Sequence, residues 1–351
     1  MRVVVIGATG NVGTALVRAL RRAGEVDEIV GVARRRPGPT LDDGRVEWIA
    51  ADISRDPLTF LAGADAVVHA AWKIQPSHHE PEMWATNVDG TRRVLEAAAS
   101  ARVPRLVYAS SVGTYAPGRK TPPVDESWPA TGIPSSTYSR HKAIVEAMLD
   151  GFEPANPRTA VVRMRTSLVF QRRAAAEVHR LFLGRWAPWR LPHPMRLVPR
   201  TARLVAQATH ADDVADAYVR ALVGTATGPF NIAAEPPLTP ALMAEVAEAR
   251  TVPLPAGVLR AAAAITYRAR LQPAEPGWLD MATQTPLMAT ARARDVLGWR
   301  PTHSAVDALR ELLDGMGQGA GDDTPPLHPR GAPVGRGIDA TDDPPETGEP
   351  R

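Results

Sequence analysis

The 351-residue sequence contains no cysteine, only three lysines among 41 basic residues, and few aromatic side chains (5%). The absence of cysteine excludes disulfides, thiol catalysis and cysteine-based metal sites. The sequence contains no run of 18 apolar residues, so it predicts no membrane span. The first predicted strand starts at residue 2, which leaves no room for a signal peptide. The nine histidines are scattered without metal-ligand spacing. We therefore expect a cytoplasmic protein without a metal site or a membrane anchor.

Charge is distributed unevenly along the chain. The formal net charge is +3, yet residues 317–351 contain seven acidic and only three basic residues, together with seven prolines and seven glycines. Such a segment cannot bury enough surface to offset its ordering entropy, so we predict a disordered tail over 317–351. The rest of the chain is basic, but it lacks the lysine-rich or aromatic–basic patterns of nucleic-acid-binding modules. An anionic small-molecule ligand explains its charge more simply than nucleic acid does.

The first 13 residues have the pattern of a phosphate-binding turn. An apolar run at residues 2–6 precedes glycines at 7, 10 and 13, and an amphipathic helix follows. A strand, a glycine turn and a helix N-terminus together cradle the pyrophosphate of a dinucleotide. Gly7 permits the tight turn, Gly10 lets phosphate approach the backbone, and Gly13 lets the helix pack closely on the strand. The same turn is expected to place Thr9, Asn11 and Val12 at the dinucleotide.

Strands and helices alternate along the first half of the chain. The predicted strands are 2–6, 28–33, 45–50, 66–70, 104–110 and 158–164, and the predicted helices are near 11–23, 82–101 and 137–150. This alternation predicts an α/β fold, a doubly wound parallel sheet of the Rossmann type over residues 1–165, with helices on both faces. After residue 165 the pattern becomes irregular, with a further strand at 230–232 and helices up to residue 316.

Tyr138 and Lys142 form a second candidate site. Lysine is so rare in this chain that we expect it where only a compact ammonium will serve. Four residues correspond to about one helical turn, so the phenol and the ammonium share a face. A nearby positive charge lowers a tyrosine pKa from its usual value of about 10, which suits the phenol for proton transfer near neutrality. The alternative is a surface pair at a common helical spacing.

Further motifs follow one another along the first 115 residues. They are Asp52-Ile53 after the third predicted strand, His69-Ala70-Ala71 ending the fourth, Asn87-Val88-Asp89-Gly90-Thr91 in a helix, and Ser110-Ser111 with Tyr115 after the fifth. With the G-x-x-G-x-x-G turn and the Tyr138–Lys142 pair, they resemble the extended short-chain dehydrogenases/reductases of the NAD-dependent epimerase/dehydratase family. The resemblance runs from residue 1 to about residue 316. It implies that residues 166–316 form a smaller C-terminal substrate-binding lobe, interleaved with the sheet.

The resemblance implies roles for individual residues in hydride transfer. Tyr138 is implied to be the acid/base, Ser111 to bind the reacting oxygen, and Lys142 to hold the nicotinamide ribose. Asn87 is implied to stabilise the Tyr138–Lys142 pair. Cofactor contacts are also implied for Asp52, Ile53, Ala70 and Ala71, with Asp52 at the adenine amino group. For Ser111, Asn87 and Asp52, a purely structural role in a turn or a helix is the alternative.

Residues about 20 positions beyond the glycines bear on the choice of cofactor. An NAD site has an acidic residue there for the ribose 2′-hydroxyl, whereas this chain has Arg34, Arg35 and Arg36 and no carboxylate before Asp42. Arginine binds a 2′-phosphate by charge and by paired hydrogen bonds. The sequence therefore favours NADP over NAD, with Arg34 and Arg35 as contacts. The alternative is a solvated basic turn in an arginine-rich protein.

The substrate is less well defined. Ser111-Val112-Gly113 stands where sugar-nucleotide dehydratases of the family have Thr-Asp-Glu, so we expect no such dehydration. The expected activity is an NAD(P)-dependent oxidoreductase acting at a hydroxyl or carbonyl carbon of a small molecule. A sugar-nucleotide epimerase and a non-catalytic dinucleotide sensor are the alternatives. Arginines 172, 173, 180, 185 and 190 are candidates for holding a diphosphate, and Trp186 and Trp189 for lining an apolar pocket. The resemblance also implies a homodimer formed through helices 82–101 and 137–150.

Overall fold

The computed structural model describes residues 1–331 except 76, 185–187, 190–195 and 202. Its centre is a seven-stranded parallel sheet in the order β10-β6-β5-β4-β1-β2-β3. The strands are β1 (Arg2–Ile6), β2 (Glu28–Ala33), β3 (Glu47–Ala50), β4 (Ala66–His69), β5 (Arg105–Tyr108), β6 (Ala160–Thr166) and β10 (Gly228–Ile232). The chain starts in the middle, builds one edge and then returns to build the other. This order confirms the predicted doubly wound Rossmann-type fold.

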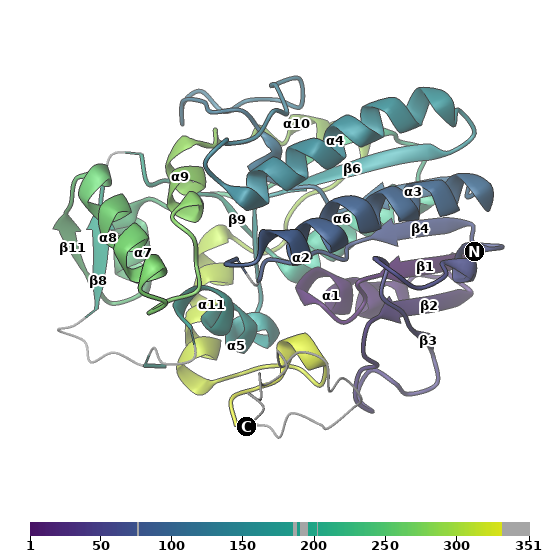
Figure 1. The fold of residues 1–351 in the computed structure, drawn as a ribbon, viewed down its shortest axis with the longest axis horizontal. Helices are drawn as coiled ribbons and strands as arrows, with labels where there is room; N and C mark the ends of the chain where they lie inside the picture. Colours follow the sequence, from purple (N-terminus) through teal and green to yellow (C-terminus); the bar gives the residue numbers. More distant parts are fainter. Residues whose placement is uncertain (76, 185–187, 190–195, 202, 332–351) are drawn as a thin grey trace, which may run out of the picture.

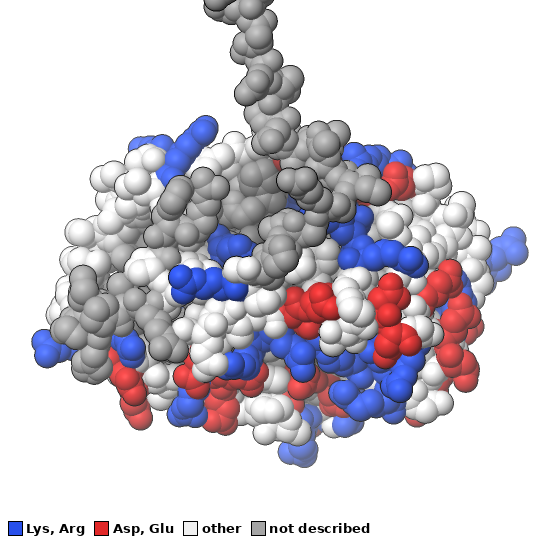
Figure 2. All heavy atoms as spheres, turned by 90° about the horizontal axis from the view of Figure 1, so that it is seen from below, with Lys and Arg blue, Asp and Glu red and all other residues white. Residues whose placement is uncertain are grey.

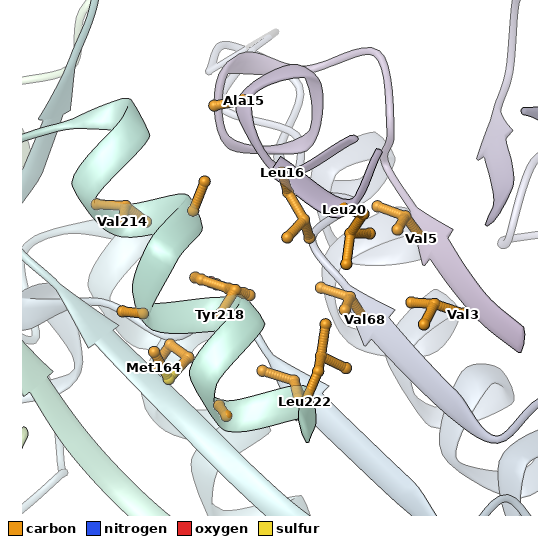
Figure 3. Packing of buried hydrophobic residues seen from close by; sticks show 14 of the residues in the cluster. Val3, Val5, Ala15, Leu16, Leu20, Val68, Met164, Val214, Tyr218 and Leu222 are labelled. Atoms are coloured by element: carbon orange, nitrogen blue, oxygen red, sulfur yellow. The ribbon is translucent and has the colours of Figure 1, made fainter. Parts of the chain in front are cut away.

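Helices cover both faces of the sheet, which explains why the strands are apolar on both sides. α1 (Asn11–Leu20) and α6 (Ala211–Val223) pack on one face, and α3 (Gly90–Ser100) and α4 (Thr137–Ala155) pack on the other. Figure 3 shows the first of these two cores, with the buried Tyr218 of α6 among side chains from α1 and the strands. The two cores hold the carboxyl ends of the strands in fixed positions.

The helix predicted at 82–101 is present but divided. α2 (Glu80–Trp84) leads into one turn of π-helix (Ala85–Asp89), and α3 follows directly. A π-helical turn is rare and often lies at a functional site. An apolar repeat of about 3.6 residues predicts a helix here, but it does not reveal the local widening.

Beyond residue 166 the chain alternates between the sheet layers and a smaller region beside them. Figure 1 shows β8, β11, α7 and α8 together at one end of the molecule, whereas α6 and β10 return to the sheet. The remaining elements are β7 (Leu168–Phe170), α5 (Ala175–Val178), β8 (Leu197–Arg200), β9 (Ala208–His210), α7 (Pro240–Val246), β11 (Arg250–Pro253), α8 (Ala256–Arg268), α9 (Gly277–Gln284), α10 (Ala291–Val296) and α11 (Ala305–Gln318). The sequence did not predict the short pairs β7–β9 and β8–β11, because three or four residues give no recognisable period.

The segment after α11 lies against the body of the protein. Gly319 ends α11 in a left-handed conformation, with a φ of 64°. Residues 319–331, called the C-terminal strap from here on, then run past α5 toward α1, and Figure 1 draws them in yellow. Leu327 of the strap is fully buried, and Asp322 forms a buried ion pair with Arg18 of α1.

This packing corrects the prediction of a disordered tail. Disorder is wrong for residues 317–331, whereas residues 332–351 lie outside the part of the chain that the structure describes. The prediction relied on a shortage of apolar side chains. In the structure, polar side chains and backbone groups of the strap bond to the body, and a single leucine supplies most of its buried aliphatic surface. Composition alone therefore underestimated how well residues 317–331 pack on the body of the protein.

The molecular surface gives two further observations. On the face seen in Figure 2, basic and acidic side chains are interspersed, and they do not separate by sign. None of the helices in the described ranges has the length and apolar character that crossing a bilayer requires. The same ranges contain no cluster of three His, Asp or Glu side chains arranged to hold a metal ion.

Candidate active site

The glycine turn between β1 and α1 is shaped for close approach of a ligand to the backbone. Gly7 has a φ of +88°, and a Cβ there would lie 2.6 Å from the Ala71 nitrogen. A Cβ on Gly13 would lie 2.1 Å from the Gly7 oxygen, so both positions require glycine. A Cβ on Gly10 would meet the Gly7 oxygen only at 3.5 Å, which leaves space above this residue. Because α1 begins directly after Gly10, its first N–H groups are available to an anion such as a pyrophosphate.

A cavity of about 600 Å³ opens beside this turn. It brings together most of the residues predicted at the cofactor, namely Gly7, Thr9, Gly10, Arg34, Arg35, Asp52, Ile53, Ala70 and Ala71. The cavity lies at the carboxyl ends of β1 to β4, where doubly wound sheets bind ligands. The side chains of Asn11 and Val12 do not line the cavity and make contacts within the fold. Asn11 Nδ2 donates to the Val169 carbonyl (2.9 Å), and Val12 packs on the core beneath α1.

The three consecutive arginines after β2 differ in what they contact. Arg36 Nη2 donates to the Trp48 carbonyl (2.8 Å), so this arginine supports the fold. Arg34 and Arg35 are exposed and line the cavity. Neither has a carboxylate partner within 4.0 Å among the described residues. Their guanidinium groups are therefore the positive charges on this side of the cavity that the fold does not use.

Asp52 lines the cavity while bonding to its own turn. Its Oδ1 accepts hydrogen bonds from the backbone nitrogen (2.9 Å) and the hydroxyl (2.6 Å) of Ser54. Burial disfavours the charged carboxylate, but the Ser54 hydrogen bonds and the positive charge of Arg34 outweigh it and lower the pKa of Asp52. The hydrogen bonds that Asp52 makes in this structure are those of an aspartate in a turn. Its contact with adenine stays a prediction.

Ser111 and Tyr138 meet at the carboxyl end of β5. Ser111 follows β5 and accepts a hydrogen bond at Oγ from the Gly113 nitrogen (3.0 Å), while Tyr138 lies in the first turn of α4. Burial raises the pKa of Tyr138 to about 12, and a hydrogen bond with Ser111 offsets part of this shift. At neutral pH the phenol is therefore protonated and can donate. The structure thus brings together two of the residues predicted to be catalytic.

Lys142 lies on the same helix but makes different contacts. Its Nζ donates to the Ala109 carbonyl (2.6 Å) and to Tyr108 Oη (3.3 Å). The same atom lies 3.5 Å from the centre of the Trp72 ring and 5.8 Å from the centre of the Tyr138 ring. Burial lowers the pKa of Lys142 well below its usual value, against the opposing charge of a nearby carboxylate. The prediction that Lys142 lowers the Tyr138 pKa is therefore wrong for this structure, because burial dominates at the phenol.

Asn87 acts on the loop after β4. It lies in the π-helical turn, is fully buried, and bonds to both backbone groups of Lys73. Its Oδ1 accepts from the Lys73 nitrogen (2.7 Å), and its Nδ2 donates to the Lys73 carbonyl (2.8 Å). Because Lys73 follows Trp72, Asn87 fixes the loop that places Trp72 over Lys142. The structure gives Asn87 no direct contact with Tyr138, so a stabilising effect on the Tyr138–Lys142 pair would pass through this loop.

Aromatic side chains surround Tyr138, and the sequence did not identify them. The Tyr138 ring lies 5.9 Å from Trp72 and 4.8 Å from Trp278 of α9, and Trp278 lies 4.9 Å from Phe182. Aromatic pairs at these separations attract one another beyond simple burial. They come from three distant parts of the chain, so no local pattern could reveal them. We call Trp72, Phe182 and Trp278 the aromatic wall.

A buried ionic network behind Ser111 was also missed. Glu146 of α4, only 1% exposed, accepts hydrogen bonds from Arg163 (3.0 Å) and Arg165 (2.9 Å) of β6 and from the Ser110 hydroxyl. Arg165 continues the network to Tyr115 Oη (3.2 Å), which is fully buried. The alternation of Arg163 and Arg165 within an apolar strand is the one signal in the sequence that points to such a network.

The arginines predicted to hold a diphosphate are dispersed. Arg172 bonds to Gln318, and Arg173 lies 3.8 Å from Asp322 of the strap. Arg180 lines the cavity and donates to strap carbonyls. Residues 185, 186 and 190 lie outside the described residues. Trp189 stacks on His179, with ring centres 3.9 Å apart, and borders the cavity.

Known proteins share this chain's sequence and fold. A protein of Mycobacterium tuberculosis without assigned function is 31% identical over 317 residues, which is 89% of this chain but only 30% of that protein. The chain thus spans less than a third of that relative. A 3-diazoavenalumate denitrifying reductase of a Streptomyces species is 29% identical over 335 residues, or 91% of this chain and 100% of the reductase. A UDP-glucose-4-epimerase from Stenotrophomonas maltophila, solved with NAD, has the same fold with a TM-score of 0.68 and 19% identity. The structural match covers 90% of this chain and 98% of the epimerase.

A family model matches most of the chain. The match covers residues 3–233, which include the glycine turn, both candidate catalytic positions on α4 and the last sheet strand β10. The description of this family names NAD, in agreement with the open glycine turn and the cavity beside it. The chain belongs to the NAD dependent epimerase/dehydratase family.

Proposed function

We propose that the protein is an NAD(P)-dependent oxidoreductase that reduces a carbonyl carbon, or oxidises the corresponding hydroxyl, in an apolar ring-containing compound. The observation that carries this proposal is the position of the Tyr138 phenol, at the start of α4 where Ser111 follows β5, with the aromatic wall beside its ring. The Streptomyces relative, a reductase, supports this class of reaction.

The chain's own residues divide the chemistry between them. A bound nicotinamide would supply or accept the hydride. Ser111 orients the substrate oxygen, and Tyr138 donates a proton to that oxygen as negative charge develops on it. A phenol whose pKa is about 12 is almost wholly protonated at pH 7, so Tyr138 is in the form that can donate a proton. Lys142 places its amino group beneath Trp72, where we expect the nicotinamide ribose.

The aromatic wall favours an oxidoreductase over a sugar-nucleotide epimerase. Trp72 meets the Tyr138 ring in a T-shaped arrangement, and Trp278 is tilted against the same ring. Such apolar surroundings suit an aromatic or polycyclic substrate and leave the hydroxyls of a sugar without partners. An epimerase therefore remains the second candidate.

For the cofactor we propose a preference for NADP over NAD. Arg34 and Arg35 line the cavity without carboxylate partners among the described residues, so both can bind a 2′-phosphate. Asp52 is already bonded to its turn, which makes it a poor substitute for the acidic residue that reads a free 2′-hydroxyl.

We also propose a homodimer formed through residues 82–101 and α4. Val88, Leu95 and Ala98 are buried within the subunit, at 0%, 6% and 0% exposure. They pack on the sheet and cannot face a partner. Trp84, at 37% exposure, is the large apolar side chain at the start of this surface that remains available.

Substitution of Tyr138 by Phe tests the proposed function. The change removes the proton donor and keeps the ring, so turnover of ring-containing ketones should fall by about 10²–10⁴ while cofactor affinity is retained. Tyr267→Phe is the matched control, because it removes the same hydroxyl from a tyrosine that is not one of the candidate catalytic residues. The Tyr267 ring stacks on His78, with ring centres 3.9 Å apart. Full activity in Tyr138→Phe would refute the assignment. Cofactor binding without turnover of any carbonyl compound in the wild type would instead favour a sensor.

A further inference from the structure

The C-terminal strap bonds to both loops that are expected to hold the cofactor. Thr324, which is fully buried, donates from Oγ1 to the Thr9 carbonyl in the glycine turn (2.9 Å). On the other side, the Asp323 carbonyl accepts from the Gly38 nitrogen (2.7 Å). The Asp323 carboxylate accepts from the nitrogen (3.3 Å) and the hydroxyl (3.2 Å) of Thr40. Gly38 and Thr40 belong to the loop that carries the arginines after β2.

Further contacts fix the strap at its two ends. Asp322 pairs with Arg18 of α1 and is buried. Arg180 donates one hydrogen bond of 2.8 Å to the Pro326 carbonyl and another of 2.8 Å to the His328 carbonyl. Between these anchors Leu327 is fully buried. The strap therefore has one defined position over α1 and α5.

The side of the strap that faces the cavity suits an anionic ligand. Its residues there are Pro325, Pro326, His328, Pro329, Arg330 and Gly331. Neither of its carboxylates borders the cavity, because Asp322 and Asp323 are bonded to Arg18 and Thr40. The strap thus contributes a guanidinium group and no carboxylate to the lining of the cavity, which avoids repulsion of a phosphate.

We propose that the C-terminal strap is part of the dinucleotide-binding site and must undock before the cofactor can leave. This inference rests on the proposed function, because it takes an NAD(P) molecule as the occupant of the cavity. The cavity is lined by both the strap and the glycine turn, so the strap forms a wall of the site and does not fill it. Dissociation of a dinucleotide from this space requires at least the Thr324–Thr9 and Asp323–Thr40 bonds to break.

The test is the rate at which reduced cofactor dissociates. Stopped-flow measurement follows energy transfer from tryptophan to bound NADPH or NADH, because Trp72 and Trp189 border the cavity. Deletion of residues 320–351 should raise the dissociation rate at least tenfold. Deletion of 332–351 alone is the matched control and should leave the rate unchanged. Thr324→Val removes one hydrogen bond and should raise the rate about fivefold, whereas Thr251→Val, an exposed threonine of β11, should have no effect.

The outcomes separate this inference from the function on which it rests. A full chain that binds neither NAD(H) nor NADP(H) would overturn the proposed function and the role of the strap with it. If the full chain binds cofactor, but Thr324→Val and both deletions release it at the same rate as the full chain, the proposed role of the strap is wrong and the proposed function stands. Slower dissociation or tighter binding after deletion would show that the strap blocks the site, which also contradicts the proposal. Thr324→Val keeps the test valid if the longer deletion does not fold.

Discussion

We predict that the affinity for the cofactor depends on pH through Glu177. This residue of α5 lines the cavity together with Arg180. Burial raises the pKa of Glu177 to about 7, although the charge of Arg180 opposes the shift. A carboxylate at this place repels a pyrophosphate, so the dinucleotide binds best when Glu177 is protonated. Raising the pH through 7 should therefore weaken binding.

The size of the effect follows from the pKa. If binding requires neutral Glu177, the apparent dissociation constant rises by a factor of about 1.1 at pH 6 and about 11 at pH 8, an overall change of about tenfold. Glu177→Gln should remove this dependence and bind NAD at pH 8 as tightly as the wild type does at pH 6. Glu245→Gln, at an exposed position of α7, is the matched control.

Calorimetric titration with NAD between pH 6 and pH 8 measures this dependence. NAD is the better probe, because the 2′-phosphate of NADP has a pKa of its own near 6. Parallel pH profiles for the wild type and Glu177→Gln would refute the reasoning. The stability of the free protein gives an independent check. A raised carboxyl pKa contributes stability below the unfolded value of 4.5, and this contribution is lost as the pH rises to about 7. Glu177→Gln should remove that loss, at most about 3 kcal/mol.

Three further predictions concern the cofactor, the core and the assembly. Replacing Arg34 by Asp and Arg35 by Ala should weaken the binding of NADP at least tenfold more than the binding of NAD. Equal effects on both cofactors in a fluorescence titration would show that the two arginines are solvated surface residues without a role in cofactor choice. Glu146→Gln should lower the free energy of unfolding by about 3–5 kcal/mol in urea, because it leaves the buried Arg165 guanidinium without its carboxylate, whereas Arg163 keeps Asp150 and Glu153. Asp150→Asn, an exposed partner of the same network, should cost less than about 1 kcal/mol. Sedimentation should show a dimer at micromolar concentration that Trp84→Glu converts to a monomer; a wild-type monomer would contradict the proposed interface.

The sequence predicted the parts of the site that depend on neighbouring residues. The glycine turn is readable because a strand, three glycines and a helix follow one another within 20 residues, and both Gly7 and Gly13 have a steric reason. A common site for Ser111 and Tyr138 could be expected from the family resemblance, which implies that both act on the reacting oxygen. The strand order could be expected as well, since alternating strands and helices leave few ways to build a parallel sheet.

The sequence could not predict contacts between distant segments. Thr324 and Thr9 are 315 positions apart, and the hydrogen bond between them has no signature in composition. The surroundings of Lys142 depend in the same way on Trp72, which the loop after β4 brings over its ammonium. Burial of Tyr138 depends on Trp278 from α9 and reverses the direction of the expected pKa shift. In each case the decisive partner is brought close only by the complete fold.

The place of β10 in the sheet has a consequence for synthesis on the ribosome. β10 pairs with β6 and with no other strand of the seven-stranded sheet, yet about 60 residues separate the two along the chain. At roughly 5–20 residues per second, β6 waits about 3–12 s for its partner to be made. During that interval the backbone groups along one side of β6 are unpaired and can pair with β6 of another nascent chain. Variants that slow translation or weaken β10 should therefore reduce the yield of soluble protein more than they reduce the stability of the finished fold.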